Sequence, residues 1–84
     1  MSNSLRVTLI TPEQTIYDGE AVSVSSKNKT GPFDILLHHE NFISIIFGEV
    51  KVRQMDGKVI SLPIDQAVLM ATGDVVKVFT GLRK

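Results

Sequence analysis

The 84-residue sequence contains no cysteine, and this absence removes three kinds of chemistry at once. Without thiols the chain can form no disulfide, no thiolate zinc site and no cysteine nucleophile. It also lacks any apolar run of about 18 residues, so no membrane-spanning helix is predicted. With 43% hydrophobic residues it nevertheless has enough apolar surface for a core, and its length predicts one globular domain over residues 1–84.

An excess of charge of either sign is also missing. Nine Lys and Arg residues balance nine Asp and Glu residues, which gives a formal net charge of zero. Because nucleic acid and anionic lipid are held by a basic excess, neither is expected as a partner, and a protein partner is favoured. The first four residues carry no charged and apolar signal segment, so the expected default compartment is the cytoplasm.

The sequence is rich in β-branched residues, with ten Val and eight Ile, and no window of about eleven residues keeps helical spacing. Residues 5–9 alternate apolar and polar side chains, as do residues 22–25, 50–53 and 60–62. This period of two predicts strands whose apolar side chains, including Val22, face inward. Pro12 is expected to end the first strand.

Three glycine-containing segments are predicted as turns between strands. Asp56-Gly57 is the strongest, because this dipeptide accepts the positive φ angles of a tight hairpin. Gly73-Asp74 predicts a second hairpin, and Tyr17-Asp18-Gly19 predicts a third turn. Turn signals at intervals of about 8 to 12 residues predict an antiparallel sandwich or barrel of about eight to ten short strands.

Two segments leave two interpretations open. Residues 42–47 are apolar at five of six positions, which fits a strand covered on both faces or a strand whose outer face meets another protein. The polar segment from Lys27 to Gly31 precedes the apolar pair Pro32-Phe33. It fits an exposed binding loop with an apolar tip as well as a plain connection between strands.

Residue types that carry catalysis or metal binding form no complete site. Adjacent His38 and His39, followed by Glu40, would point to opposite faces of a strand, so a metal ion would need ligands from elsewhere. No nucleophile elbow surrounds the serines, and the six glycines are dispersed rather than gathered in a phosphate-binding loop. We therefore expect no metal, no cofactor and no catalytic residue.

Three stretches of the chain share the pattern of one family in order and spacing. They are Leu9-Ile10-Thr11-Pro12-Glu13 with Tyr17-Asp18-Gly19, then Gly31-Pro32-Phe33-Asp34-Ile35-Leu36 with His39 and Asn41-Phe42-Ile43, and finally Gly48-Glu49-Val50-Lys51-Val52 with Ala67-Val68-Leu69 and Gly73-Asp74-Val75-Val76-Lys77-Val78. Together, over residues 5–80, they resemble the N-terminal domain of the epsilon subunit of rotary proton-translocating ATP synthases, called delta in mitochondria.

The resemblance implies an all-β fold, a flattened antiparallel β-sandwich of about ten strands, and a non-catalytic role in the central rotor. In the family this domain links the gamma subunit to the ring of membrane c subunits and couples proton flow to ATP synthesis. The residues that the resemblance assigns to gamma are Thr11, Pro12, His39, Phe42 and Ile43; those assigned to the loop facing the c ring are Asn28, Lys29, Thr30, Gly31 and Pro32. The implied location is peripheral, on the cytoplasmic face of the energy-transducing membrane.

The sequence departs from the family pattern at several places. Leu37-His38 stands where members have proline and glycine before the histidine, Glu40-Asn41 replaces alanine-proline, and Asp65-Gln66 replaces a glycine pair. The family normally continues into a pair of C-terminal helices that bind ATP and inhibit hydrolysis. Because this sequence ends at residue 84, that helical hairpin and its regulation are expected to be absent.

Two other protein classes remain as alternatives. A lipoyl or biotinyl swinging-arm carrier is also a small all-β domain with a lysine on a hairpin, and Lys58 adjoins Asp56-Gly57. Residues 55–59, however, do not supply the neighbours that such a lysine needs. An OB-like nucleic-acid binder is disfavoured because five aromatic residues and zero net charge make a poor stacking platform in a basic groove.

Overall fold

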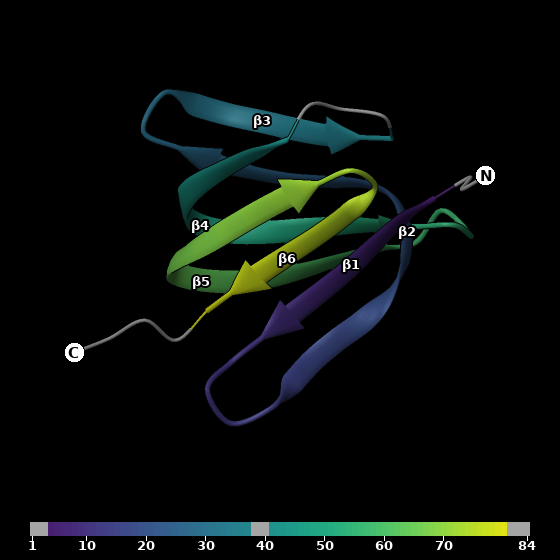
Figure 1. The fold of residues 1–84 in the computed structure, drawn as a ribbon, viewed down its shortest axis with the longest axis horizontal. Helices are drawn as coiled ribbons and strands as arrows, with labels where there is room; N and C mark the ends of the chain where they lie inside the picture. Colours follow the sequence, from purple (N-terminus) through teal and green to yellow (C-terminus); the bar gives the residue numbers. More distant parts are fainter. Residues whose placement is uncertain (1–3, 38–40, 81–84) are drawn as a thin grey trace.

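A computed structural model describes residues 4–37 and 41–80 as six β-strands, with no helix among these residues (Figure 1). The strands are β1 (Leu5–Ile10), β2 (Thr15–Asn28), β3 (Gly31–Leu36), β4 (Phe42–Gln54), β5 (Val59–Thr72) and β6 (Val75–Phe79). The all-β prediction is confirmed, and the abundance of β-branched residues accounts for it.

The strands form one sheet in the order β1-β6-β5-β4-β2-β3, and β2 also pairs with β1. This last pairing closes the sheet into a barrel-like arrangement, with β3 beside the C-terminal part of β2. All pairs are antiparallel except β1 with β6. The prediction of a wholly antiparallel sheet is therefore wrong at this pair. Its members are far apart in the sequence, so no hairpin dictates opposite directions.

The described residues hold six strands, so the predictions of eight to ten strands from turn spacing and about ten from the resemblance are wrong in number. The physical reason is that β2, β4 and β5, at 13 or 14 residues each, continue through bends instead of ending there. In β4 the pairing with β5 shifts between Phe47 and Gly48, and Gly48 has a φ of +88°. Such a bulge bends a strand without ending its hydrogen-bonded ladder.

The core contains apolar side chains from all six strands, each fully or almost fully buried. Alternation in β1 is confirmed, because its three odd-numbered residues all face inward. The buried set comprises Leu5, Val7, Leu9, Ala21, Val24, Ile35, Ile46, Val50, Val52, Ala67, Leu69, Ala71, Val76 and Val78. Burying these side chains is the main favourable contribution to folding.

Two of the three predicted turns are confirmed. Asp56-Gly57 joins β4 to β5, with Gly57 at a φ of +92° and the Asp56 carboxylate accepting the Lys58 amide at 3.0 Å. Gly73-Asp74 joins β5 to β6, with Gly73 at a φ of +60°. Both glycines adopt the left-handed backbone that residues with a side chain rarely take.

The predicted turn at residues 17–19 is wrong, because these residues lie inside β2 and pair with β1. The turn is instead at residues 11–14, where the Thr11 hydroxyl accepts the Gln14 amide at 3.1 Å. Pro12 follows the end of β1 as predicted. Gly19 is small for a different reason: a Cβ there would lie 3.1 Å from the Tyr17 hydroxyl, so its absence leaves room for the tyrosine ring.

Val22 does not face inward as its alternation predicts; it is 38% exposed. The pairing of β2 with β4 shifts between Ala21 and Ser23, which inserts one extra residue at Val22. Ala21 and Val24 are buried on either side of this irregularity. A bulge reverses the direction of alternating side chains, so strict period-two reasoning fails there.

Candidate interaction surface

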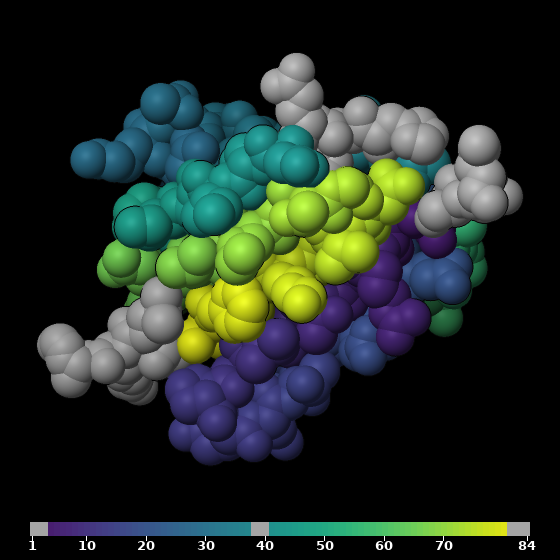
Figure 2. Space-filling view, in the orientation of Figure 1, coloured from purple at the N-terminus to yellow at the C-terminus, as the bar shows by residue number. Residues whose placement is uncertain are grey.

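An apolar surface covers the outside of four neighbouring strands. Along β4, β5, β6 and β1 the register pairs Ile43 with Met70, Ile45 with Val68, Val68 with Phe79, and Phe79 with Ile10. We call this set, together with Val75, the outer apolar face: Ile10, Ile43, Ile45, Val68, Met70, Val75 and Phe79. Figure 2 shows the four strands as adjacent bands in teal, green, yellow and purple across one side of the molecule.

The outer apolar face exists in addition to the core. Ile46, Leu69 and Val78 point inward from the same strands and are completely buried. Their neighbours Ile43 and Ile45 point the other way and are 68% and 48% exposed. Because solvent-facing strand positions are ordinarily polar, a contiguous apolar set on the outside indicates a surface that another molecule covers.

Of the two interpretations of residues 42–47, the structure excludes a strand covered on both faces within the described chain. Ile43 and Ile45 are exposed, as above. Phe42 points inward instead, and its ring meets that of Phe33 edge to face, with centroids 5.7 Å apart and planes at 80°. Ser44 also points inward, where its hydroxyl accepts a hydrogen bond from the Asn28 side chain at 3.0 Å.

The structure does not gather the predicted gamma-facing residues into one patch. Ile43 lies within the outer apolar face, whereas Phe42 on the inner side is half-buried. Thr11 and Pro12 form the β1–β2 turn, at the end of β1 opposite the one that lies beside the β5–β6 turn (Figure 1). His39, with the candidate metal ligands His38 and Glu40, lies outside the described residues.

Of the two interpretations of the segment from Lys27 to Phe33, the structure shows a connection between strands: a β-hairpin whose turn consists of Lys29 and Thr30. The side-chain oxygen of Asn28 accepts hydrogen bonds from the Thr30 amide at 2.9 Å and from the Thr30 hydroxyl at 2.7 Å. Gly31 follows at a φ of +124°. The five residues assigned to the c ring, Asn28, Lys29, Thr30, Gly31 and Pro32, therefore lie together at one hairpin tip.

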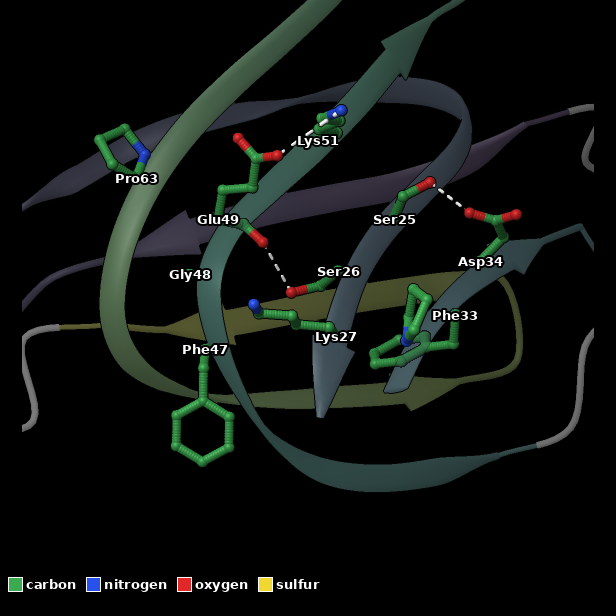
Figure 3. Close-up of a pocket in the computed structure, with 11 residues that line it drawn as sticks. Ser25, Ser26, Lys27, Phe33, Asp34, Phe47, Gly48, Glu49, Lys51 and Pro63 are labelled. Atoms are coloured by element: carbon green, nitrogen blue, oxygen red, sulfur yellow. Dashed lines mark hydrogen bonds and ion pairs between the residues drawn. The ribbon is translucent and has the colours of Figure 1, made fainter. Parts of the chain in front are cut away.

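A cavity of about 460 Å³ is lined by residues of β2, β3, β4 and β5 (Figure 3). Several of its polar side chains have hydrogen-bond or ion-pair partners. Ser25 donates to Asp34 at 2.5 Å, and Glu49 accepts from Ser61 at 2.7 Å and lies 3.5 Å from the Lys51 ammonium group. The Ser61 hydrogen bond, helped by Lys51, lowers the pKa of Glu49.

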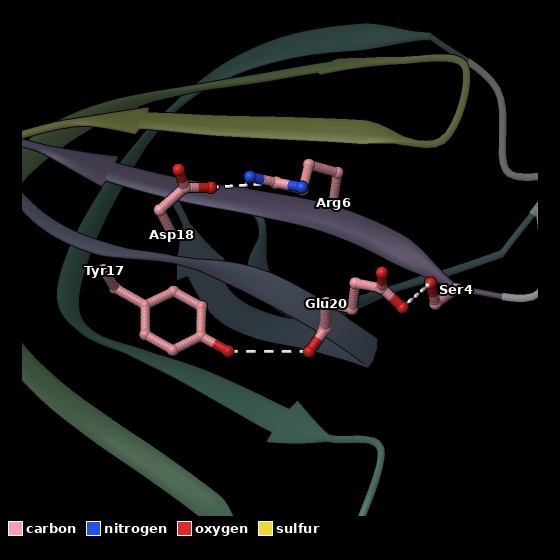
Figure 4. Close-up of polar contacts among 5 residues, drawn as sticks. All are labelled: Ser4, Arg6, Tyr17, Asp18 and Glu20. Carbon is pink, nitrogen blue, oxygen red and sulfur yellow. Dashed lines mark hydrogen bonds and ion pairs between the residues drawn. The ribbon is translucent and has the colours of Figure 1, made fainter.

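On the side of β1 and β2, the outer apolar face is bordered by polar side chains (Figure 4). The Arg6 guanidinium donates to Asp18 at 2.8 Å across the two strands. This hydrogen bond lowers the pKa of Asp18 and raises that of Arg6. Ser4 donates to the Glu20 carboxylate at 2.9 Å. These exposed pairs are typical of a solvated rim.

Sequence reasoning found only the β4 part of the outer apolar face. Val68 and Met70 were missed as surface residues, although residues 67–71 are apolar at both alternating positions, as residues 42–47 are. The signal that would have indicated Val68 and Met70 is an unbroken apolar run in each of two paired strands. Phe79 and Ile10 carry no such signal, because only the register places them beside Val68.

The described part of the chain also bears on other classes of site. It contains no cluster of three or more potential metal-ligating side chains. Nor does it contain a helix long and apolar enough to cross a membrane.

Residues 4–81 match the protein family described as "ATP synthase, Delta/Epsilon chain, beta-sandwich domain". The chain belongs to this family. The match confirms the resemblance proposed from the three sequence stretches, and it spans all of the described residues.

Among curated proteins of this delta/epsilon family, the ATP synthase epsilon chain of Sulfurimonas denitrificans is 31% identical over 68 residues. The aligned region covers 80% of this chain but 52% of that protein, so the chain spans about half the length of the curated relative it matches.

Two solved structures have the same fold. A chain of the Euglena gracilis mitochondrial ATP synthase, in a structure of its OSCP, F1 and c-ring, superposes with a TM-score of 0.88 at 18% identity, covering 95% of this chain and 52% of that one. A chain from the central stalk and c-ring of the Tetrahymena thermophila mitochondrial ATP synthase gives 0.73 at 13% identity, covering 90% and 62%.

Proposed function

We propose that the chain is a non-catalytic rotor component of an ATP synthase, which links the gamma subunit to the c ring and so couples proton flow to ATP synthesis. Membership of the delta/epsilon family supports the role. The observation that carries it is the outer apolar face, because transmitting torque between subunits requires a large, tightly packed contact rather than a reactive group. The chain then acts at the membrane peripherally, on its cytoplasmic face, through the complex.

The two predicted contacts divide between two parts of the molecule. The gamma subunit covers the outer apolar face, in which Ile43 is the predicted interface residue that lies exposed. The c ring meets the tip of the β2–β3 hairpin at Lys29 and Thr30. We also propose that the closed sheet is flattened into the two-layered sandwich that the family resemblance implies, with each layer serving one role.

The apolar nature of the face supports a buried protein contact. Removing the exposed and half-buried Ile, Val, Met and Phe side chains of this face from water is favourable by about 25 cal/mol per Å² of apolar surface. Part of that gain offsets the loss of translational and rotational freedom on binding. A partner with a complementary apolar surface can therefore hold this domain without any catalytic or cofactor chemistry.

The test places a charge at the centre of the face and at a matched position elsewhere. Ile45 and Val59 are both β-branched, lie on neighbouring strands, and are each 48% exposed. Ile45→Asp should weaken binding to the gamma subunit by several kcal/mol, because a carboxylate would be buried without a partner. Val59→Asp should bind normally, since it lies outside the face and opposite Arg53.

Calorimetric titration of each folded variant with purified gamma subunit measures both effects. Circular dichroism establishes that the strands are retained. Equal binding by Ile45→Asp and the original chain would overturn the assignment of gamma to this face.

The carrier-domain alternative has no support from the family match. Lys58 lies exposed at the β4–β5 hairpin, as a carrier lysine would, but the chain matches the delta/epsilon family over residues 4–81. A mass spectrum of the chain purified from a host with lipoyl and biotinyl ligases provides the check. An added lipoyl or biotinyl mass on Lys58 would favour the carrier function.

A further inference from the structure

Lys77 lies on β6 between Val75 and Phe79 of the outer apolar face, beside the polar border on β1 and β2. Its strand neighbours are Met70 on β5 and Thr8 on β1. Along β6, the residues two positions away on the same side are Val75 and Phe79. The ammonium-bearing side chain is therefore surrounded by apolar side chains on three sides and by one threonine on the fourth.

No carboxylate within the described residues pairs with Lys77. The ion pairs among residues 4–37 and 41–80 join Arg6 to Asp18 and Lys51 to Glu49. Asp18 is the acidic residue of β2 that lies across Thr8, and it is already held by Arg6 at 2.8 Å. Lys77 thus contributes an unbalanced positive charge to an otherwise apolar patch.

A partner that covers this face has to deal with that charge. Taking an ammonium group out of water without a counter-ion costs several kcal/mol, and the neighbours of Lys77 on β5 and β6 are apolar and offer none. A carboxylate on the partner offsets this cost, since oppositely charged groups in contact are favourable in a partly dehydrated interface. The methylene groups of Lys77 can meanwhile pack against Met70 and Phe79.

We propose that the surface covering the outer apolar face carries a carboxylate opposite Lys77, flanked by apolar side chains that contact Met70 and Phe79. This inference rests on the proposed function, in which the covering partner is the gamma subunit. It specifies the chemistry of that partner's contact: an acidic residue within an apolar segment. The pair fixes the register of docking, because apolar contacts alone tolerate sliding along a flat strand surface.

The test relies on the change in gamma affinity caused by Lys77→Met, which should have opposite signs depending on whether the partner has an acidic residue opposite Lys77. If an acidic residue faces Lys77, Lys77→Met strands that carboxylate in the interface and should weaken gamma binding by about thirtyfold or more. Lys77→Glu should weaken it further through like-charge repulsion, while Lys77→Arg should stay within about threefold. If no acidic residue faces it, Lys77→Met adds apolar surface and should bind as tightly or more tightly.

Titration of each variant with purified gamma subunit separates these outcomes, and Lys58→Met at the distant β4–β5 hairpin is the matched control. Unchanged or tighter binding by Lys77→Met would overturn the proposal while leaving the proposed function intact. Absence of binding by the original chain would overturn the proposed function and, with it, this inference. Restored binding between Lys77→Glu and a gamma variant with lysine in place of the facing carboxylate would establish the pair.

Discussion

The outer surface of β4 is apolar before Gly48 and polar after it. Ile43 and Ile45 project outward from the first part, whereas Lys51 and Arg53 do so from the second. Strand β5 shows this contrast only in part: its outward positions include Ser61 but also the apolar Val59 in its first part, and Met70 in its last. Because both parts bury an equally apolar inner side, folding alone does not require the apolar outer side.

This difference indicates where function constrains the sequence. At the cavity of Figure 3, the Glu49 carboxylate has two partners, Ser61 and Lys51. On the outer apolar face the exposed side chains have no such matching, and Lys77 has no acidic partner among the described residues. A surface whose charged groups have partners on the same molecule is suited to contact with water. An exposed apolar surface that carries an unpaired charge is suited to contact with another protein.

The largest effect should come from contrasting two adjacent residues on opposite sides of β4. Ile46 is completely buried and Ile45 is 48% exposed. Ile46→Ala should lower the free energy of unfolding by about 2–5 kcal/mol, because it removes packed methyl groups and leaves a cavity. Ile45→Ala should lower it by less than about 1 kcal/mol. Urea denaturation of both variants measures the difference.

Similar losses of unfolding free energy in Ile46→Ala and Ile45→Ala would contradict the assignment of the inner and outer sides of β4. Gamma binding should show the opposite ranking, since only Ile45 belongs to the outer apolar face. A folded Ile46→Ala variant should bind gamma nearly as well as the original chain.

The second effect concerns the bend that divides the two surfaces. Gly48 has a φ of +88°, so Gly48→Ala should lower the free energy of unfolding by about 1–2 kcal/mol through backbone strain. Gly48→Asn should cost less, because asparagine tolerates this conformation better. Thermal or urea unfolding compares the two.

Steric contact is the competing explanation for a loss at Gly48. A Cβ at this position would lie 3.1 Å from Cε of Lys27, whose flexible side chain can move away. Adding Lys27→Ala to Gly48→Ala should therefore recover little stability. Full recovery in the double variant would assign the cost to the side-chain contact instead of the backbone.

Much of the fold follows from local sequence patterns, and the exceptions have identifiable causes. Alternation in residues 5–9 and the Asp56-Gly57 hairpin could be predicted because each depends on neighbouring residues alone. Val22 could not, since a bulge against β4 sets its direction. The turn expected at Gly19 failed because its small size accommodates Tyr17. The family could be recognised from spaced motifs that survive such local irregularities.

The candidate site was less predictable for a related reason. Residues 42–47 revealed excess apolar character, but which of them are outward depends on parity, and Phe42 proved to be inward. The position of Lys77 among Met70, Val75 and Phe79 depends on the pairing of strands far apart in sequence. Register is a property of the closed sheet, so no local pattern specifies this neighbourhood.

The smallest expected effect is on the pH dependence of stability, for which we compare Asp18 at the rim of the outer apolar face with Glu49 on the polar surface. The hydrogen bond from Arg6 lowers the pKa of Asp18 below its ordinary value of 3.8, and the hydrogen bond from Ser61 lowers that of Glu49 below 4.5. A carboxylate with a lower pKa in the folded state stabilises the fold fully above its ordinary pKa. That contribution decreases as the pH falls through the ordinary value and is lost below the lowered one.

Asp18→Asn and Glu49→Gln should each reduce the loss of stability between neutral pH and about pH 3, measured by urea unfolding. Added salt should diminish the Asp18 effect more, because its partner is a full charge, whereas the main partner of Glu49 is a neutral hydroxyl. A pH dependence identical to that of the original chain in both variants would show that neither carboxylate is stabilised by its neighbours.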